Sequence, residues 1–460
     1  MSDYDFAIIG SGPGGYVAAV RAGQLGAKVA LIEKDLFGGT CLNYGCIPTK
    51  TLIHSGRIAA MAREMEEYGV RTGEVDIDYS VMASRKDKVV KTLRDGTEKL
   101  LKARGVEIIR GTGRLAGAGA VQVESAEGDS RTIRARHVIL ATGSAPARPS
   151  AFNIDGERIL TSDDAVKLVS IGKSVIILGG GYIGCEYASL YANLGLDVTI
   201  VELLDTILTG QDVDVIKHVG RGLKRRGVKF RTGVRVESIE RVDESVKAIL
   251  EGGREMTADM ALVAVGRRPV TEELGLESVD IKTDKGYVSV DERCRTSAGS
   301  IWAIGDITGR LALAHVASAQ AIVAVEDALG RGSKMSYEVV PSCIFTDPES
   351  ASVGLTEAEV AESGVGYAVG RFQFRTLGKA QAEGNLEGMV KMIAEVETGR
   401  ILGVHITGAA ASSLVGEMAL AIRTGATAAD IMDTIHAHPT FPEALKEAAE
   451  DLEGRAIHAV

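Results

Sequence analysis

Hydrophobic and polar residues follow a clear order near the start of the chain. An apolar run at 5–9 leads into a glycine-rich turn at 10–15. A stretch of small residues at 16–25 then precedes a second apolar run at 28–32, which Glu33 ends. Short runs that are apolar throughout are typical of buried parallel strands, whereas the longer stretch between them fits a helix. The pattern predicts a strand, a tight turn, a helix and a strand that ends in an acid.

The same order returns in the middle of the chain. It consists of an apolar run at 174–178, a glycine turn at 179–184, a helix-like stretch at 185–194 and a second apolar run at 197–201, which Glu202 ends. In both units the acid stands 23 residues after the first glycine. We interpret the two units as an internal duplication of one device. This favours an α/β fold with two Rossmann-like dinucleotide-binding domains.

The remaining segments predict further elements of both kinds. Residues 54–103 have a mainly helical pattern with an interruption near 69–78, and residues 106–140 alternate short strands with glycine-rich turns. From about residue 341 the character changes, because strand-like runs between 389 and 407 are followed by helices. We therefore expect a separate C-terminal α+β domain.

Composition narrows the classes of function. The chain has 460 residues, of which 45% are hydrophobic and 25% charged, and its formal net charge is -10. The length predicts about three domains. The acidic surplus argues against nucleic acid as a partner, because phosphate contacts need Lys and Arg, and we expect no membrane span. Five cysteines in so long a chain do not indicate the framework of a secreted protein, and the N-terminus shows no targeting pattern, so we expect a cytoplasmic location.

Cys41 and Cys46 lie shortly after the first unit, with glycines beside them. A disulfide that closes so short a loop adds little stability, because it removes little chain entropy. The spacing alone leaves a stabilising bridge or two free thiols as alternatives to redox chemistry. The flanking glycines and the upstream nucleotide-binding pattern favour a disulfide that opens and closes beside a cofactor.

Both glycine turns fit the binding of a dinucleotide. Glycines allow a tight turn and a close approach of the backbone to a pyrophosphate, and the helix N-terminus presents N–H groups to it. The acid at the end of the following strand accepts hydrogen bonds from ribose hydroxyls. After Glu202 come Leu203 and Leu204, so no Arg stands there to receive a 2′-phosphate. This favours NAD over NADP in the second unit.

Taken in order, the motifs of the chain resemble those of the pyridine nucleotide–disulfide oxidoreductases over essentially its whole length. Besides the two glycine turns, the resemblance rests on the segments 39–50, 141–144, 265–269, 303–306, 313–315 and 436–440 with Glu443. It implies an FAD-binding domain at 1–145, an NAD-binding domain at 146–270, a central domain at 271–340 that completes the FAD site, and an interface (dimerisation) domain at 341–460.

The resemblance also implies which residues hold the cofactors. Lys50 is expected near the flavin N5 and paired with Glu186, Asp306 at the ribityl chain, and Ala314 at the isoalloxazine ring. The full set expected at FAD is Gly10, Gly12, Gly15, Glu33, Thr40, Lys50, Gly113, Thr142, Gly143, Ser144, Glu186, Asp306 and Ala314. Those expected at NAD are Gly179, Gly181, Tyr182, Ile183, Glu202, Val236 and Gly266.

His438 and Glu443 form the second chemical pair. A dithiol attacks a disulfide only as a thiolate, and a His base oriented by a carboxylate removes that proton. The family pattern places this base in the partner subunit's active site, has Cys41 exchange with substrate and sets Cys46 facing the flavin. The alternative for His436 and His438 is a metal site, but no further ligands follow at metal-site spacing, so we expect no metal.

The resemblance implies a homodimer that oxidises dihydrolipoamide through the Cys41–Cys46 disulfide and FAD and reduces NAD. Its partners would be the lipoyl domains of a 2-oxo acid dehydrogenase complex or of a glycine cleavage system. The alternatives are another reductase of the family that acts on a low-molecular-weight disulfide, a mercuric reductase, and a docking subunit or redox sensor without catalysis. Glu202 argues against the NADPH-dependent glutathione type, and residues 454–460 lack the cysteine pair usual in mercuric reductases.

Overall fold

A computed structural model describes residues 2–459 of the chain. The first unit has strand β1 (Tyr4–Ile9), helix α1 (Pro13–Gln24) and strand β2 (Val29–Glu33), in the predicted order. β1 pairs in parallel with β2 on one side and with β6 (Ser130–Leu140) on the other. Strands inside a parallel sheet are usually covered by other elements on both faces, and the last four residues of β1 and all of β2 are buried accordingly.

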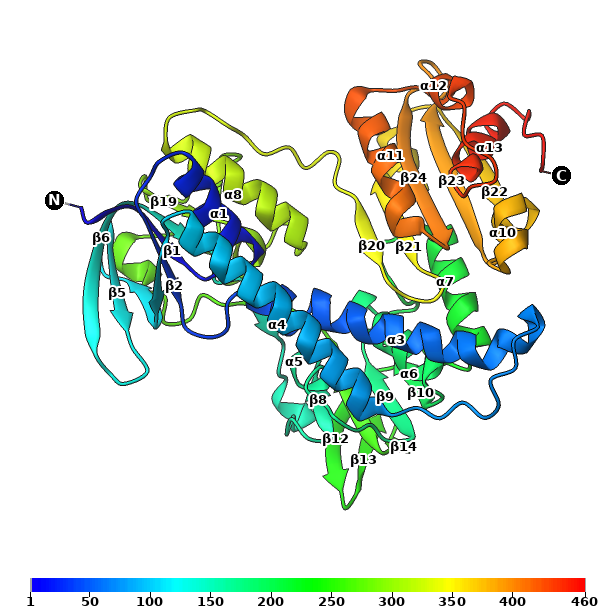
Figure 1. Cartoon of the computed structure of the whole chain (residues 1–460), viewed down its shortest axis with the longest axis horizontal. Helices are drawn as coiled ribbons and strands as arrows, with labels where there is room; N and C mark the ends of the chain where they lie inside the picture. Colours follow the sequence, from blue (N-terminus) through cyan, green and yellow to red (C-terminus); the bar gives the residue numbers. More distant parts are fainter. Residues whose placement is uncertain (1, 460) are drawn as a thin grey trace.

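The first sheet draws on two distant parts of the chain. Its strand order is β3-β2-β1-β6-β5-β4, and β19 (Ile301–Ala303) pairs in parallel with β6. Helix α8 (Ala314–Ala328) packs against α1 on this sheet (Figure 1). The other strands are β3 (Glu107–Arg110), β4 (Thr112–Leu115) and β5 (Ala120–Glu124). Residues from beyond position 300 therefore finish the sheet that the N-terminus begins.

The second unit forms a parallel sheet of its own, with the strand order β11-β10-β9-β15-β8. A three-stranded antiparallel sheet, β12-β13-β14, packs against it. The elements are β8 (Ile159–Thr161), β9 (Ser174–Leu178), α6 (Tyr182–Asn193), β10 (Asp197–Val201), α7 (Val213–Arg225), β11 (Lys229–Arg231), β12 (Val236–Val242), β13 (Ser245–Leu250), β14 (Arg254–Ala258) and β15 (Met260–Val263).

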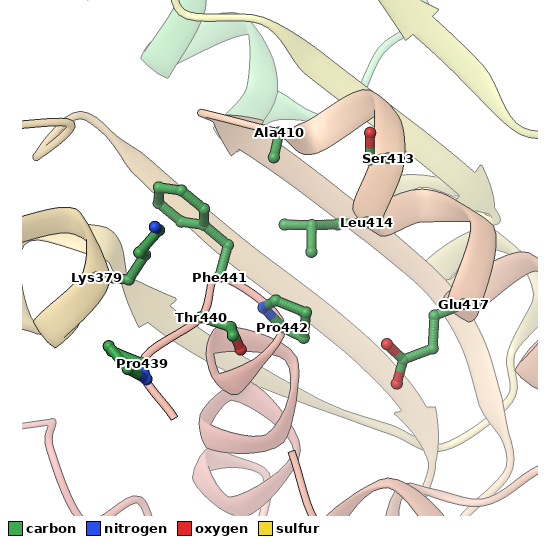
Figure 2. Close-up of a pocket in the computed structure, with 9 residues that line it drawn as sticks. All are labelled: Lys379, Ala410, Ser413, Leu414, Glu417, Pro439, Thr440, Phe441 and Pro442. Carbon is green, nitrogen blue, oxygen red and sulfur yellow. The ribbon is translucent and has the colours of Figure 1, made fainter. Parts of the chain in front are cut away.

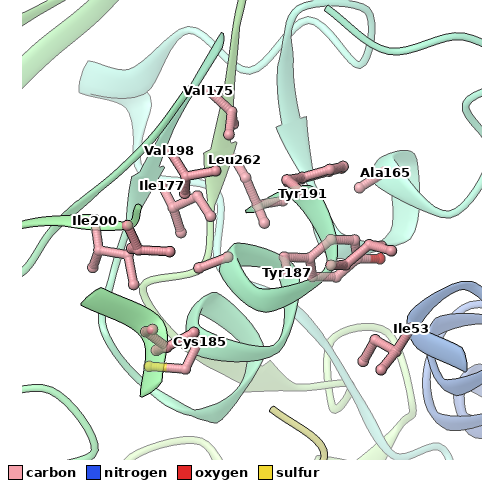
Figure 3. Packing of buried hydrophobic residues seen from close by; sticks show 14 of the residues in the cluster. Ile53, Ala165, Val175, Ile177, Cys185, Tyr187, Tyr191, Val198, Ile200 and Leu262 are labelled. Atoms are coloured by element: carbon pink, nitrogen blue, oxygen red, sulfur yellow. The ribbon is translucent and has the colours of Figure 1, made fainter. Parts of the chain in front are cut away.

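A long helical excursion leaves the first unit and packs on the second. It consists of α2 (Gly39–Asn43), α3 (Cys46–Glu64), the 3₁₀ turn η1 (Met65–Tyr68) and α4 (Tyr79–Ala103). Figure 3 shows the core that results, in which Ile53 of α3 lies with Tyr187 and Tyr191 of α6 and with the strand residues Val175 and Ile177. The active cysteines thus sit where the two units meet.

The C-terminal part is an antiparallel sheet with the order β20-β21-β24-β23-β22, covered by helices (Figure 1). The expected strands appear as β23 (Gly388–Glu395) and β24 (Ile401–Gly408). The remaining elements are β20 (Ser342–Ile344), β21 (Ser350–Gly354), α9 (Glu357–Ser363), β22 (Tyr367–Gln373), η5 (Phe374–Thr376), α10 (Gly378–Glu383), α11 (Ala411–Thr424), α12 (Ala428–Asp433) and α13 (Glu443–Asp451).

Short elements connect these parts. β7 (Ser144–Pro146), which leaves the first unit, pairs antiparallel with β16 (Arg267–Pro269), which leaves the second. The others are η2 (Ser150–Phe152), α5 (Ser162–Ala165), η3 (Leu276–Val279), β17 (Thr283–Asp284), β18 (Tyr287–Val288) and η4 (Gly305–Thr308). Within residues 2–459, no helix is both long and apolar enough to cross a membrane.

The predicted α/β fold class with a C-terminal α+β domain is confirmed. Three helices begin earlier than the pattern indicated: α1 at Pro13, α6 at Tyr182 and α3 at Cys46. In α1 and α6, glycines lie in the first helical turn, where close packing requires them. Because glycine usually interrupts a helix, the sequence pattern placed the start of these two helices too late. The bounds of the four domains stay predictions, since strands from different predicted domains pair with one another.

Candidate active site

The two glycine turns have the same geometry. A Cβ on Gly15 would lie 1.8 Å from the carbonyl oxygen of Gly10, and a Cβ on Gly184 would lie 2.0 Å from that of Gly179. Only glycine lets each helix pack so closely against its strand. The N-cap residues of α1 and α6 are Gly12 and Gly181, with no side chain bonded at either cap and no acid in either first turn. Both helix N-termini thus offer N–H donors and a positive dipole end to a phosphate.

The two acids also occupy equivalent places. Glu33 is buried and accepts hydrogen bonds from the N–H groups of Ser11 and Asp35, each at 2.8 Å. Glu202 accepts from the N–H of Gly180 at 2.5 Å and from that of Leu204 at 2.8 Å. A carboxylate has about four acceptor sites, so both acids keep acceptor capacity for ribose hydroxyls. The geometry confirms the duplication.

Cys41 lies in α2 and Cys46 is the first residue of α3, and the two thiols are hydrogen-bonded to each other. The hydrogen bond from Cys41 lowers the pKa of Cys46, and the nearby Lys50 ammonium lowers it further, although burial opposes both. The same hydrogen bond, together with burial, raises the pKa of Cys41. A helix N-terminus also favours a thiolate. In the reduced pair, these effects favour a thiolate at Cys46 and a thiol at Cys41.

Lys50 stands one helical turn after Cys46 and is tied to the second unit. Its ammonium donates to both carboxylate oxygens of Glu186, at 2.7 and 2.9 Å, and lies 4.9 Å from the ring centroid of Phe345. Glu186 is almost fully buried and also accepts from the N–H of Phe345 at 3.0 Å. The predicted pair is confirmed, and it fixes a positive charge beside Cys46.

Asp306 in η4 joins a network that links both units. Its carboxylate accepts from the Ser144 hydroxyl at 2.5 Å, and the guanidinium of Arg267 donates to the same hydroxyl at 2.8 Å and to the carbonyl of Ser144 at 2.7 Å. The hydroxyl of Thr142 donates to the carbonyl of Val270 at 2.6 Å. Sequence reasoning did not single out Arg267, although it lies in one of the quoted motifs.

The other predicted cofactor residues fall into three groups. Gly143 and Gly266 have positive φ angles, Thr40 lies beside Cys41 in α2, and Tyr182 and Ile183 open α6. Ala314 opens α8 next to His315, whose Nε2 lies 2.8 Å from the carbonyl of Pro341. Gly113 and Val236 lie in β4 and β12, where they pack against apolar neighbours, so their roles at the cofactors stay predictions.

His438 and Glu443 lie together at the start of α13. Nδ1 of His438 is 2.8 Å from Oε1 of Glu443, whose other oxygen accepts from the N–H of Thr440 at 2.7 Å. Burial opposes the ionisation of Glu443, but these two contacts lower its pKa. His436 has its own partner, Glu417, at 3.1 Å. A hollow beside this segment, shown in Figure 2, is lined by Lys379, Ala410, Ser413, Leu414, Glu417, Pro439, Thr440, Phe441 and Pro442.

One chain does not bring the two chemical pairs together. Figure 1 places α13 well away from the beginning of α3, which is where the cysteines lie. The side chain of His438 is 75% exposed and its ionic partner is Glu443 alone among the described residues. Within one chain, His438 and Glu443 therefore do not reach Cys41 and Cys46.

Comparison with known proteins decides the family. Residues 4–321 match the model described as pyridine nucleotide-disulphide oxidoreductase, and residues 340–449 match the dimerisation domain of the same family. The chain belongs to the pyridine nucleotide–disulphide oxidoreductase family. The part of the chain that presents His438 and Glu443 is thus the dimerisation domain of this family, which supports a homodimer.

Individual relatives agree over nearly the whole length. The dihydrolipoyl dehydrogenase of Halobacterium salinarum is 42% identical, over 99% of this chain and 98% of its own, and that of Bacillus subtilis is 40% identical over 99% of both. The solved structure of LpdA from Mycobacterium tuberculosis aligns with a TM-score of 0.92 at 30% identity, covering 97% of this chain and 99% of its own. The flavoprotein disulfide reductase RclA of Escherichia coli aligns with a TM-score of 0.90 at 29% identity, covering 98% of this chain and 99% of its own.

The residues present fit the cofactors of the family, FAD and a pyridine nucleotide. Both helix N-termini point N–H groups outward, both glycine turns exclude a Cβ, and each turn has its buried or partly buried acid. Ser11 was missed by sequence reasoning: its hydroxyl donates to Glu33 at 2.6 Å and accepts from the N–H of Gly38 at 3.2 Å. Its position inside the glycine turn was the available signal.

Proposed function

We propose that this chain oxidises dihydrolipoamide to lipoamide and reduces NAD. The observation that carries the proposal is the pair of Cys41 in α2 and Cys46 at the start of α3, with the Lys50 ammonium held by Glu186 one helical turn after Cys46. This arrangement lowers the pKa of Cys46 and raises that of Cys41. Such a pair stores the two electrons of a dithiol. Relatives that share about 40% of their residues with the chain are named dihydrolipoyl dehydrogenase, which supports the choice of substrate.

The exchange follows from the geometry of the two pairs. His438 takes the proton of one substrate thiol, and the thiolate attacks the sulfur of Cys41 in the oxidised Cys41–Cys46 disulfide. The S–S bond breaks and Cys46 leaves as a thiolate. The second substrate thiol gives its proton to His438 as His438 passes the first proton to the departing sulfur of Cys41. The second sulfur attacks the first, so that lipoamide leaves with its own S–S bond and Cys41 is left as a thiol. Two electrons then reside on the cysteine pair.

FAD, when bound, would supply the two-electron redox chemistry that connects the cysteine pair with NAD. The residues proposed to hold it are those of the first glycine turn with Glu33, together with Lys50, Ser144 and Asp306. The second glycine turn and Glu202 would hold NAD. The carboxylate of Glu202 would accept from a ribose 2′-hydroxyl and repel a 2′-phosphate, which supports NAD over NADP.

The base acts between subunits in this proposal. Glu443 orients the imidazole of His438 and stabilises the charge that forms when the ring takes a proton. Because one chain separates His438 from its own cysteines, each active site would combine Cys41 and Cys46 of one subunit with His438 of the other. The dimer would then be required for the dithiol reaction.

Three further predictions belong to this proposal. The lipoyl domains of a 2-oxo acid dehydrogenase complex or of the glycine cleavage system would deliver the dithiol. The cytoplasm is the proposed location, because a disulfide that is reduced in each cycle suits a reducing compartment. The domain boundaries are proposed at 1–145, 146–270, 271–340 and 341–460.

One comparison of substrates tests the function. Purified protein loaded with FAD is assayed with dihydrolipoamide and NAD, and in parallel with glutathione disulfide and NADPH. We expect turnover in the first assay alone, and Cys41→Ser, which leaves the glycine turn intact, should abolish it while FAD stays bound. Activity with glutathione disulfide and NADPH, or an unaffected Cys41→Ser variant, would contradict the proposal.

A further inference from the structure

Helix α7 of the NAD-binding unit is attached to the dimerisation domain at both of its ends. Figure 1 shows it below the strands β21 and β24. Near its end, a Cβ on Gly222 would lie 2.2 Å from Cδ of Pro348, so only glycine allows this approach. The next turn places Arg225 against Glu387, and Arg226 lies 2.7 Å from Asp347. The contacts join two parts of the chain that fold as separate sheets.

The beginning of α7 carries the strongest of these attachments. Lys391 of β23 has a fully buried side chain, and its ammonium lies 2.8 Å from Asp212, 3.1 Å from Asp214 and 2.7 Å from Glu357. Arg371 of β22 contacts Asp214 and Glu357, each at 3.0 Å. The three N–H donors of the ammonium thus meet three carboxylates. We call these five residues the Lys391 cluster.

The Lys391 cluster fixes the orientation of α7 relative to the dimerisation domain. Besides binding Lys391, Asp212 caps α7 by accepting from the N–H of Asp214 at 2.9 Å, and it also accepts from the N–H of Glu357 at 3.2 Å. Buried ion pairs contribute little to net stability, but removing one partner is costly because the other charges stay buried. His405 lies 4.0 Å from Asp212, and burial lowers its pKa, so it adds no charge.

The segment before α7 connects this cluster to the nucleotide site. Residues 203–211 run from Glu202 to Asp212. At the first end, Glu202 accepts from the N–H of Gly180. In the middle, the N–H of Leu208 donates to the carbonyl of Gly180 at 2.8 Å, and a Cβ on Gly180 would lie 2.9 Å from the side chain of Ile207. Both ends of the segment and its centre are therefore held, and the far end is held by another domain.

We propose that Lys391 is a positioning residue for the NAD site, acting from the dimerisation domain through Asp212 and the segment 203–211. This inference rests on the proposed use of NAD and adds a residue that touches neither nucleotide nor substrate. Its consequence is a split effect. Loosening the cluster should disturb NAD binding. The dithiol reaction should be unaffected, because Cys41 and Cys46 lie on α2 and α3 and His438, which contacts Glu443, makes no contact with the described residues of the cluster.

Charge balance within the cluster allows stability and positioning to be separated. With Arg371, the five residues carry a net charge of -1. Lys391→Met leaves a net charge of -2 in a buried place and should reduce stability. Lys391→Met combined with Asp212→Asn returns the net charge to -1, and Asn is as good an N-cap as Asp. The double variant should therefore regain stability without regaining the link from Lys391 to Asp212.

The experiment uses the FAD-loaded dimer. We measure the melting temperature, the KM for NAD, the rapid reduction of the flavin by dihydrolipoamide, and direct binding of NADH by calorimetry. In the double variant we expect the KM for NAD and the Kd for NADH to rise on the order of ten-fold, as for the loss of a hydrogen bond to a charged group. Flavin reduction by dihydrolipoamide should stay within about two-fold of the starting rate.

A matched control is Lys247→Met, since Lys247 of β13 also faces two carboxylates, Glu240 and Glu255, but joins no other domain. It should leave both NAD parameters unchanged. A double variant that binds NADH normally would overturn the inference, as would an equal loss in the dithiol half-reaction. NADH binding is measured without any dithiol, so it tests Lys391 even if dihydrolipoamide proves not to be the substrate. If Lys391→Met alone does not fold, the double variant and Asp212→Asn still decide the question.

Discussion

Replacing Glu443 by Gln tests the proposed base through its partner. The carboxylate contacts Nδ1 of His438 at 2.8 Å and the N–H of Thr440 at 2.7 Å. Its lowered pKa keeps it charged at neutral pH. Gln preserves the size of the side chain and one acceptor oxygen but removes the charge. The perturbation therefore withdraws the negative charge that stabilises the imidazolium formed when His438 takes a thiol proton.

The magnitude depends on how far the pair is shielded from water. A hydrogen bond to a charged group contributes about 1.5–3 kcal/mol, or roughly 10- to 100-fold in rate. An exposed ion pair contributes only about 0–1 kcal/mol. His438 is 75% exposed in a single chain, so the larger value requires that the partner subunit cover it. We expect a 10- to 100-fold loss for Glu443→Gln, and for His438→Gln a loss of about 10²–10⁴-fold, because the proton acceptor itself is gone.

The assay separates the two half-reactions. Reduction of the flavin by dihydrolipoamide should slow by these factors, whereas transfer from NADH to an artificial acceptor needs no dithiol and should survive. Heterodimers of a His438→Gln subunit with a Cys41→Ser subunit should regain one working site, since one interface then pairs intact cysteines with an intact base. Verified heterodimers without any recovered activity would show that the base serves its own chain.

The neighbouring pair His436 and Glu417, 3.1 Å apart, provides the matched control. Glu417→Gln removes the same charge from a second His–Glu pair on the same domain and should change the dithiol rate by no more than about two-fold. If Glu417→Gln slows the reaction as much as Glu443→Gln, or if Glu443→Gln loses less than three-fold against the 10-fold minimum expected, then the reasoning from the His438–Glu443 geometry is refuted.

Four other substitutions have defined outcomes. Glu202→Ala should weaken NAD binding by roughly 10- to 100-fold and reduce the preference for NAD over NADP, which titrations with both nucleotides will check. Equal use of both nucleotides by the unaltered protein would disprove the assignment. Lys50→Gln should raise the pKa of the Cys46 thiol, because it removes a positive charge that favours the thiolate; the thiolate absorbance of the reduced protein should then appear at higher pH, and an unchanged midpoint would contradict this. Gly15→Ala should lower the free energy of unfolding by about 1–3 kcal/mol or more and release FAD, because the new Cβ meets a carbonyl oxygen. Gly96→Ala in α4, with open space around it, should raise the free energy of unfolding by about 0.4–1 kcal/mol. Denaturant unfolding measures both changes.

Local pattern was enough for much of the fold. The strands around Gly10 and Gly179 are short apolar runs because both their faces are covered, so their sequences show burial directly. The glycine turns were recognisable because a Cβ has no room there. The acids were recognisable because each stands at the end of the next strand, at the same distance in sequence from the first glycine of its turn. Cys41 and Cys46 were recognisable from their spacing and from the motifs around them. These signals depend on neighbours in the chain, and the sequence therefore contains them.

The tertiary structure decided what depends on distant residues. That a thiolate is favoured at Cys46 rather than at Cys41 follows from the contact between the two thiols, from Lys50 and from the helix N-terminus. The start of α3 was hidden because Gly45 and Pro48 suggest a turn. The separation of His438 from the cysteines is a property of how two domains are placed. Lys391 and Asp212 are 179 positions apart, and a buried lysine in a strand has no local pattern that names its partners. Charge pairing over such distances is set by packing, and only the folded chain shows it.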